Sequence, residues 1–306
     1  MVRLATLASF LFLFYYFSKV TIWADSTPPK FAWPIRELEL AGLITSTFGE
    51  SRKDHYHNGI DISSVDQPVH TLASGNVIYS RYLEDDPFEE ERGSGNIVWI
   101  AHEKGFLSGY YHLGGKRHKN LKDSTILEEN EVLGVSGNTG HSSGGHLHFV
   151  LGKEFGKVLV DPFSYLPKLE DKISPQIANL FIHVGDTFTN INPGDAIQIS
   201  QNFPLTVAIL DSGIKKSQRR GIESVKYYVN GTLFKEASFS ILIYQKGEWL
   251  TTNGLRFDDL FFKDRYLVGS PNLKTGENTI RVIASDFTGL SSERTFSFTV
   301  SKLAVR

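Results

Sequence analysis

The 306-residue sequence contains no cysteine, and this absence excludes several kinds of structure at once. A disulfide framework, a zinc site built from thiolates and a lipid anchor on cysteine all require that residue. A transition metal bound by this chain must therefore use histidine nitrogen and carboxylate oxygen. That set of donor atoms suits Zn²⁺.

The sequence also lacks an excess of charge of either sign. It has 32 Lys and Arg residues against 34 Asp and Glu residues, for a formal net charge of −2. Because no basic excess is available to meet a phosphate backbone, the composition gives no indication of a nucleic-acid partner. Hydrophobic residues make up 41% and charged residues 22%, which is ordinary for a globular protein of about two domains.

The N-terminal apolar run is too short for a membrane span. It covers residues 4–17, whereas a spanning helix needs about 20 residues. Arg3 before the run and Ala24 after it predict a signal peptide over residues 1–24. An uncleaved anchor is the alternative, because Ile22 is larger than the residue preferred near a cleavage site. Both interpretations place the rest of the chain outside the cytoplasm, in the periplasm, cell envelope or medium, and we expect no stable membrane span after cleavage.

Beyond this segment, the sequence predicts a linker over residues 25–43 and two all-β domains over residues 44–167 and 175–306. Short runs with strand character alternate with glycine-rich turns, and no amphipathic helix of three turns is evident. The first domain is expected to be a mostly antiparallel sheet and the second an immunoglobulin-like β-sandwich. The predicted strands include residues 75–79, 96–101, 146–151, 196–199, 205–209, 225–229, 279–284 and 295–300.

The second domain contains one basic run, Lys-Lys-Ser-Gln-Arg-Arg at residues 215–220. We interpret it as a solvated hairpin loop, and a binding patch is the alternative. A further hypothesis makes this domain an adhesion or docking module, so a protein partner of the C-terminal domain is possible.

Histidines are concentrated in the first domain, where nine of the ten lie between positions 55 and 148. His146 and His148 are two residues apart in a predicted strand, so their side chains point to the same face. Leu147 and Phe149 then point to the opposite face, into a core. Two surface histidines would give the same pattern, and the pair alone is ambiguous.

His57 and Asp61 form a second candidate group. Their spacing would stack them on a helix, but the intervening Asn58 and Gly59 argue against one. We expect instead a turn that leads into a strand, with Asp61 facing away from the core. His112 ends a further predicted strand at residues 109–113. Each group alone has an ordinary structural explanation, but the combination in one β-domain predicts a metal centre.

In this combination residues 44–167 resemble the M23 family of zinc metallopeptidases, the lysostaphin and LytM-type cell-wall endopeptidases. The family pattern is His-x-x-x-Asp, a Tyr-x-His or similar strand, and His-x-His. This chain has His57 to Asp61, a strand with Tyr110 and His112, and His146 with His148; Phe48-Gly49, residues 134–140 and Asp161-Pro162 also match. An acidic insertion at residues 85–93 and the absence of an acidic residue after Phe149 depart from many members, which affects substrate preference.

The resemblance implies that His57, Asp61 and His148 ligate Zn²⁺ and that His112 and His146 are the catalytic pair. We assign the transition-state-stabilising role to His112 and the base role to His146. The implied reaction is hydrolysis of stem or bridge peptides of peptidoglycan by a zinc-bound water, in a groove built from loops 84–94 and 114–127. The alternative is a non-hydrolytic LytM-type regulator or wall-binding module that activates other cell-wall hydrolases; some such domains lose ligands, but all five positions are present here.

Overall fold

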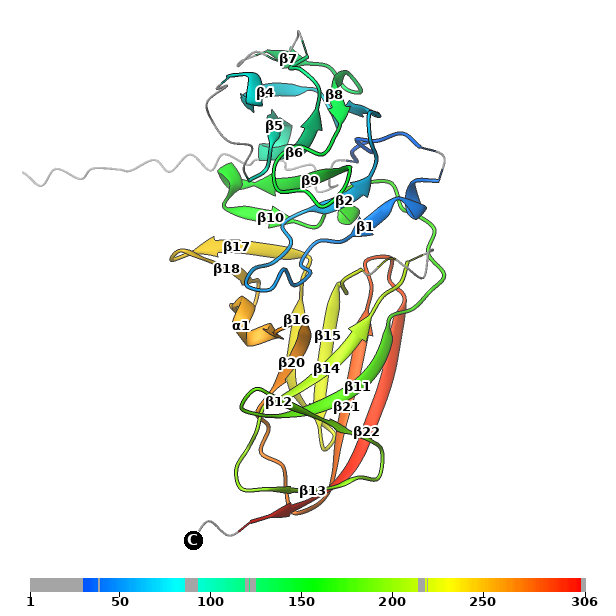
Figure 1. Ribbon diagram of the computed structural model, residues 1–306, viewed down its shortest axis with the longest axis vertical. Coiled ribbons are helices and arrows are strands. Elements are labelled where there is room, and N and C mark those ends of the chain that lie inside the picture. Colours follow the sequence, from blue (N-terminus) through cyan, green and yellow to red (C-terminus); the bar gives the residue numbers. More distant parts are fainter. Residues whose placement is uncertain are drawn as a thin grey trace, which may run out of the picture.

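The computed structural model describes residues 30–37, 39–85, 93–118, 121, 125–213, 218 and 220–303. The predicted signal peptide lies outside these residues. Two units are stacked along the long axis of the molecule, and both are built almost entirely from antiparallel strands, as predicted (Figure 1). Within the described residues, no helix is long and apolar enough to cross a membrane.

One large sheet forms the first unit. Its central strands run in the order β10-β9-β6-β5-β4-β7, with β1 and β2 joined beside β9, and β3 and β8 joined beside β6. The strands are β1 (Ile44–Ser46), β2 (Ile60–Ser63), β3 (Pro68–His70), β4 (Gly75–Arg81), β5 (Asn96–His102), β6 (Phe106–Gly114), β7 (Ile126–Leu127), β8 (Val132–Ser136), β9 (His146–Lys153) and β10 (Val158–Val160). Short 3-10 helices lie at Leu40–Gly42, Leu83–Asp85, Glu103–Gly105, Glu154–Gly156 and Pro162–Ser164.

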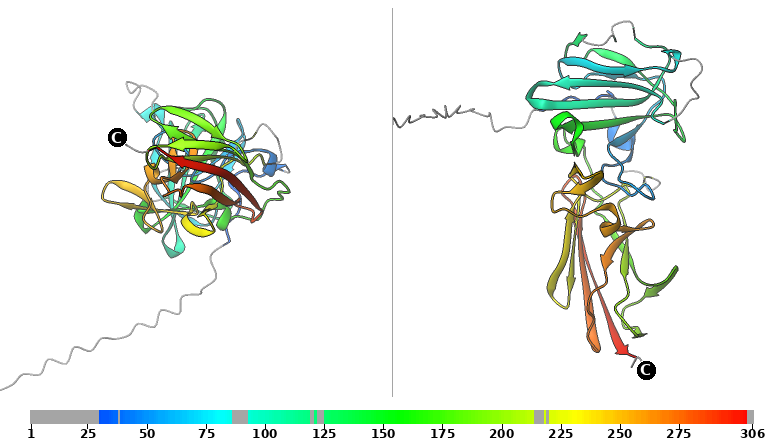
Figure 2. Two further views of the ribbon diagram at one scale, coloured as in Figure 1. Left: turned by 90° about the horizontal axis from the view of Figure 1, so that it is seen from below. Right: turned by 90° about the vertical axis from the view of Figure 1, so that its left-hand side faces the viewer.

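Two five-stranded sheets form the body of the second unit, in the orders β12-β11-β14-β20-β19 and β13-β22-β21-β15-β16. Figure 2 shows this unit from two further directions, with the C-terminal end of the chain at its far end from the first unit. Their strands are β11 (Gln176–Val184), β12 (Thr187–Ile191), β13 (Ala196–Ile199), β14 (Leu205–Leu210), β15 (Ser224–Val229), β16 (Thr232–Ser238), β19 (Phe261–Phe262), β20 (Arg265–Gly269), β21 (Gly276–Ser285) and β22 (Ser291–Lys302). The one α-helix among the described residues is α1 (Phe257–Leu260). The predicted strand runs all fall within observed strands, and the immunoglobulin-like assignment stays a prediction.

A hairpin from the second half of the chain completes the sheet of the first unit. Strands β17 (Ile241–Gln245) and β18 (Glu248–Thr251) form this hairpin, and β17 pairs antiparallel with β10. The large sheet therefore has 12 strands and ends with β18 (Figure 1). Backbone hydrogen bonding thus joins the two units across the boundary that composition suggested.

The two faces of β9 belong to different surroundings. Leu147, Phe149 and Leu151 are fully buried in the core of the first unit. Val150 points the other way and belongs to the core cluster of the second unit, which also includes Phe48 and Tyr56 from the loop before β2. Because residues alternate along a strand, His146 and His148 share the face of Val150. The site therefore lies on the side of the sheet where the two units meet.

Close contacts at the junction correct the interpretation of the basic run. Gln218 and Arg220 are buried, at 7% and 8% exposed, and donate hydrogen bonds to the carbonyl oxygens of Gly42 and Ala41, both at 2.7 Å. The solvated-loop interpretation is therefore wrong for these two residues, because their side chains donate hydrogen bonds to backbone carbonyl groups of the first unit and not to solvent. Residues 215–217 and 219 lie outside the described residues.

Candidate metal centre

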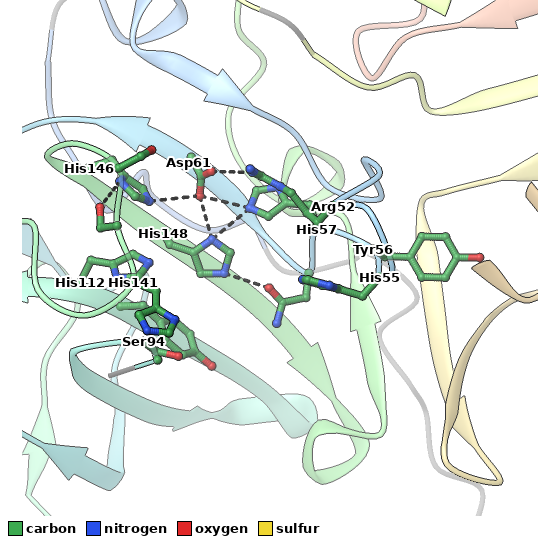
Figure 3. Close-up of a pocket in the computed structure, with 15 residues that line it drawn as sticks. Arg52, His55, Tyr56, His57, Asp61, Ser94, His112, His141, His146 and His148 are labelled. Carbon is green, nitrogen blue, oxygen red and sulfur yellow. Dashed lines mark hydrogen bonds and ion pairs between the residues drawn. The ribbon is translucent and has the colours of Figure 1, made fainter. Parts of the chain in front are cut away.

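Three donor atoms converge on the face of β9 that looks toward the junction. Asp61 on β2 lies directly opposite His148 on β9, and the loop before β2 supplies His57. The distances are 3.1 Å from His57 Nε2 to Asp61 Oδ1, 3.0 Å from His57 Nε2 to His148 Nδ1, and 2.8 Å from His148 Nδ1 to Asp61 Oδ1 (Figure 3). All three residues are at least nine-tenths buried, and together they could hold one metal ion.

Gly59 permits this approach. A Cβ added there would lie 2.2 Å from the carbonyl oxygen of Phe149, far inside a van der Waals contact. With any larger residue, β2 would have to move away from β9 and take Asp61 with it. The Asn58-Gly59 pair, which argued against a helix in the sequence, thus serves the packing that brings Asp61 to His148.

Hydrogen bonds on the far side of each ring set the histidine tautomers. His57 Nδ1–H donates to the carbonyl oxygen of Thr47 at 2.7 Å, and His148 Nε2–H donates to Asn58 Oδ1 at 2.9 Å. The ring nitrogens that face Asp61 are then left with lone pairs. Such outer partners are typical of metal-binding histidines, because they fix the ring orientation and the tautomer. Two lone pairs and a carboxylate oxygen about 3 Å apart fit one cation.

The protonation states agree with this donor set. Burial lowers the pKa of His148 to about 4, so the ring is neutral at neutral pH. Burial opposes ionisation of Asp61, but His57 and His148 beside it hold the pKa of that carboxyl well below its usual range. The other oxygen of this carboxylate, Oδ2, accepts a hydrogen bond from Arg52 Nη2 at 2.8 Å. Nothing in the sequence pattern pointed to Arg52, Thr47 or Asn58 as partners of the site.

His112 and His146 lie side by side next to the three donor atoms, with ring centroids 4.8 Å apart. His112 Nδ1–H donates to the carbonyl oxygen of Thr139 and His146 Nδ1–H to that of Gly144, at 2.7 and 2.8 Å. Both rings therefore present Nε2 toward the site, and His146 Nε2 is 3.7 Å from Asp61 Oδ1. Burial lowers the pKa of His112. The five residues singled out from the sequence are thus brought together.

The backbone at His112 is unusual. Its φ of 58° lies in the left-handed region, which only roughly a few per cent of residues other than glycine adopt. His112 N donates to the carbonyl oxygen of Ser94, so a neighbouring loop holds this conformation. Strained backbone of this kind is concentrated at functional sites. In a regular strand, the side chains of Tyr111 and His112 would point to opposite faces of the sheet. Here the Tyr111 ring also contacts that of His148, so both side chains lie near the site.

An open cleft of about 490 Å³ surrounds the five residues. The expected loop 84–94 contributes Gly93 and Ser94, and its residues 86–92 lie outside the described part of the chain. The second expected loop, 114–127, supplies no lining residue in its described part. Residues 141–143 and 55–58 line the cleft instead. His55 and His141 therefore border the site but are not among its three donors, whereas His102 is hydrogen-bonded to Ser108 away from the cleft.

Comparison with known proteins agrees with this geometry. The model of Peptidase family M23 matches residues 55–162, and a second family model matches residues 174–301. The cell division protein DipM of Caulobacter vibrioides is 29% identical over 147 residues, which are 48% of this chain and 20% of DipM. The peptidoglycan DD-endopeptidase ShyA of Vibrio cholerae is 32% identical over 96 residues, 31% of this chain and 20% of ShyA.

The murein hydrolase activator NlpD of Escherichia coli is 31% identical over 145 residues, which cover 47% of this chain and 33% of NlpD. In all three cases the match spans only a fifth to a third of the relative's length. The match to the model of Peptidase family M23, residues 55–162, lies in the unit that carries the candidate metal centre.

Proposed function

Because this chain belongs to peptidase family M23 through residues 55–162, we propose that it is an exported zinc endopeptidase that hydrolyses peptide cross-links of bacterial peptidoglycan. The observation that carries the proposal is the buried triangle of His57 Nε2, Asp61 Oδ1 and His148 Nδ1 beside two further histidines. The names of ShyA and NlpD connect similar domains with peptidoglycan or murein, which supports the substrate class and a place in the cell envelope.

In this proposal His57, Asp61 and His148 hold the zinc. Zinc bound there supplies a water of lowered pKa and polarises the scissile carbonyl. One carboxylate and two neutral imidazoles leave the centre with a net charge of +1. Arg52 keeps the second oxygen of Asp61 occupied, so that Oδ1 stays directed at the other two donors.

His112 and His146 carry the proton movements. Their Nδ1–H groups are held by carbonyl oxygens, so a neutral ring accepts a proton at Nε2 and a protonated ring donates from it. One ring takes the proton of the attacking water, and a protonated ring donates a hydrogen bond to the developing oxyanion. The hydrogen bonds favour the same tautomer in both rings, so the separate roles assigned from the resemblance stay a prediction.

Digestion of purified peptidoglycan tests the proposal. Residues 25–306 are expected to release cross-linked peptides, identified by mass spectrometry, in the presence of zinc. A chelator is expected to abolish release and added zinc to restore it, because three protein donors alone provide no activated water. Zinc-loaded protein that cleaves no purified wall material would contradict the endopeptidase.

The alternative function is a non-hydrolytic regulator or wall-binding module that activates other cell-wall hydrolases. This alternative is supported by the similarity to the murein hydrolase activator NlpD, which is 31% identical over 145 residues. The complete set of three donors and two flanking histidines favours the enzyme. Stimulation of a separate wall hydrolase by protein that itself cleaves nothing, with or without zinc, would support the regulator.

The cleft continues toward the second unit. His55 and Tyr56 line it and also line a second depression with Trp249, Arg256 and Phe257. The Tyr56 ring contacts that of Phe257 with centroids 5.2 Å apart. We propose that a substrate longer than the scissile dipeptide extends into this depression, where Trp249 offers a broad apolar contact.

Trp249→Ala is therefore expected to raise KM about tenfold and to leave kcat nearly unchanged, because the contact is remote from the reacting bond. Steady-state kinetics on a soluble cross-linked peptide measures both constants. Phe234→Ala is the matched control, since Phe234 is a 43% exposed aromatic of β16 outside both depressions. Equal KM values for the two variants would remove Trp249 from the substrate path.

A further inference from the structure

Three carboxylates from separate segments meet at the end of the second unit that faces the first. Asp171 lies in the connector before β11, Asp211 follows β14 and Asp286 follows β21. One oxygen of each lies within 4.8 Å of the others. The Asp171 side chain is 2% exposed, and Asp211 and Asp286 are each 3% exposed. This cluster takes no part in the metal centre described above.

Charge within the cluster is not balanced by the described residues. Arg220 Nη1 donates to Asp171 Oδ2 at 3.0 Å, and its Nη2 is taken by the carbonyl oxygen of Ala41 in the first unit. Among the residues that the structure describes, Arg220 is the one cation that forms an ion pair with these carboxylates. One guanidinium against three carboxylates leaves two negative charges, and buried charges are costly unless a partner compensates them.

Two carboxylate oxygens are buried without a hydrogen-bond partner among the described residues, Asp211 Oδ1 and Asp286 Oδ2. The other oxygen of Asp286 accepts hydrogen bonds from the backbone N–H groups of Thr288 and Leu290. The turn after β21 therefore fixes the carboxylate and leaves Oδ2 for a ligand. Buried acceptors of this kind are rare unless an ion or water completes them.

We propose that Asp171, Asp211 and Asp286 bind one calcium ion at the junction of the two units. A set made only of hard carboxylate oxygens favours calcium, magnesium or manganese over zinc, and calcium accepts irregular arrangements of six to eight oxygens more readily than magnesium does. The ion would tie the connector to two strand ends. Through Arg220, which bonds both Asp171 and Ala41, it would also stabilise the first unit against the second.

A shared proton is the competing occupant. Burial and the neighbouring Asp286 and Asp171 raise the pKa of Asp211 to about 7. Without a cation, a neutral Asp211 would relieve one negative charge. If a proton occupies the site, Asp211→Asn should stabilise the protein in the absence of calcium. If calcium occupies it, the same change removes a ligand and should abolish the stabilisation by calcium.

The test is thermal unfolding of zinc-loaded residues 25–306 with and without millimolar calcium. Calcium is expected to raise the unfolding temperature by about 5 °C or more, and calorimetry to show one bound ion per chain. Asp211→Asn and Asp286→Asn keep the side-chain shape and are expected to abolish the calcium shift. Asp186→Asn, at a side chain that is 96% exposed, is the matched control and should keep it.

His148→Ala, which we expect to lack zinc, should still be stabilised by calcium. The calcium site can therefore be tested separately from the proposed zinc endopeptidase.

Two results would overturn the inference of a calcium site. One is a wild-type protein that shows no calcium-dependent shift. The other is an Asp211→Asn variant that is as stable without calcium as the wild type is with it, which would assign the site to a proton. Magnesium is the comparison ion and should give a smaller shift.

Discussion

His148→Ala is expected to yield folded protein without bound zinc and without measurable cleavage of peptidoglycan. The change removes Nδ1, which lies 2.8 Å from Asp61 Oδ1 and 3.0 Å from His57 Nε2. Two remaining donors no longer fit a catalytic zinc site, which normally has three protein ligands and an open position. Metal content by mass spectrometry and digestion of purified peptidoglycan measure the two losses, and we expect activity to fall at least about a thousandfold.

His70→Ala provides the matched control, because His70 lies on β3 and its Nδ1–H donates to the carbonyl oxygen of Asn130 away from the cleft. This variant should bind zinc and cleave peptidoglycan like the wild type. Full zinc content together with full activity in His148→Ala would remove His148 from the ligand set. Circular dichroism separates loss of metal from loss of fold.

His112→Asn is expected to keep zinc and to lower kcat about 10²- to 10⁴-fold, the usual contribution of a positioned proton-transfer group. Asparagine is the informative substitution because it tolerates the left-handed backbone, with φ of 58°, better than alanine does. His112→Ala should show the same loss of activity with a further loss of stability. Zinc content, kcat and the unfolding temperature are measured on all three proteins.

The pH profile of kcat/KM then separates the two possible roles. A base must be deprotonated, so activity rises with pH through its pKa, and burial lowers the pKa of His112. If His112 is the base, the acidic limb lies below the ordinary histidine value of about 6.5 and disappears in His112→Asn. If the acidic limb is unchanged in His112→Asn, the base role belongs to His146. Loss of zinc from His112→Asn would instead make His112 a ligand.

Local pattern was sufficient to predict several strands in each unit and to single out the five site residues. The donors lie in short segments, and alternation along β9 places His146 and His148 on one face. Sequence could not predict the pairing of β10 with β17, because backbone hydrogen bonds between distant segments leave no residue signature. Nor did it predict the left-handed backbone of His112, which its contact with Ser94 holds.

The basic run shows a second limit of pattern. A sequence of charged residues predicts solvent exposure on average, but Arg220 is 8% exposed because Asp171 and Ala41 supply its partners from distant parts of the chain. The contact of Arg52 with Asp61 could not be predicted either, because it too depends on a partner that only folding brings close. Its role depends on Asp61, nine positions away across a turn, and on a geometry that only the folded loop creates.

The pairing of β10 with β17 has a consequence for solubility. In a fragment that ends at residue 167, the backbone N–H and carbonyl groups of β10 that now face β17 would have no partner. Residues 158–160 are Val-Leu-Val, and an unpaired apolar edge is a template for association with a second copy. By pairing with β10, β17 of the C-terminal half covers this edge, and we expect a fragment that ends at residue 167 to associate with itself more readily than the longer chain.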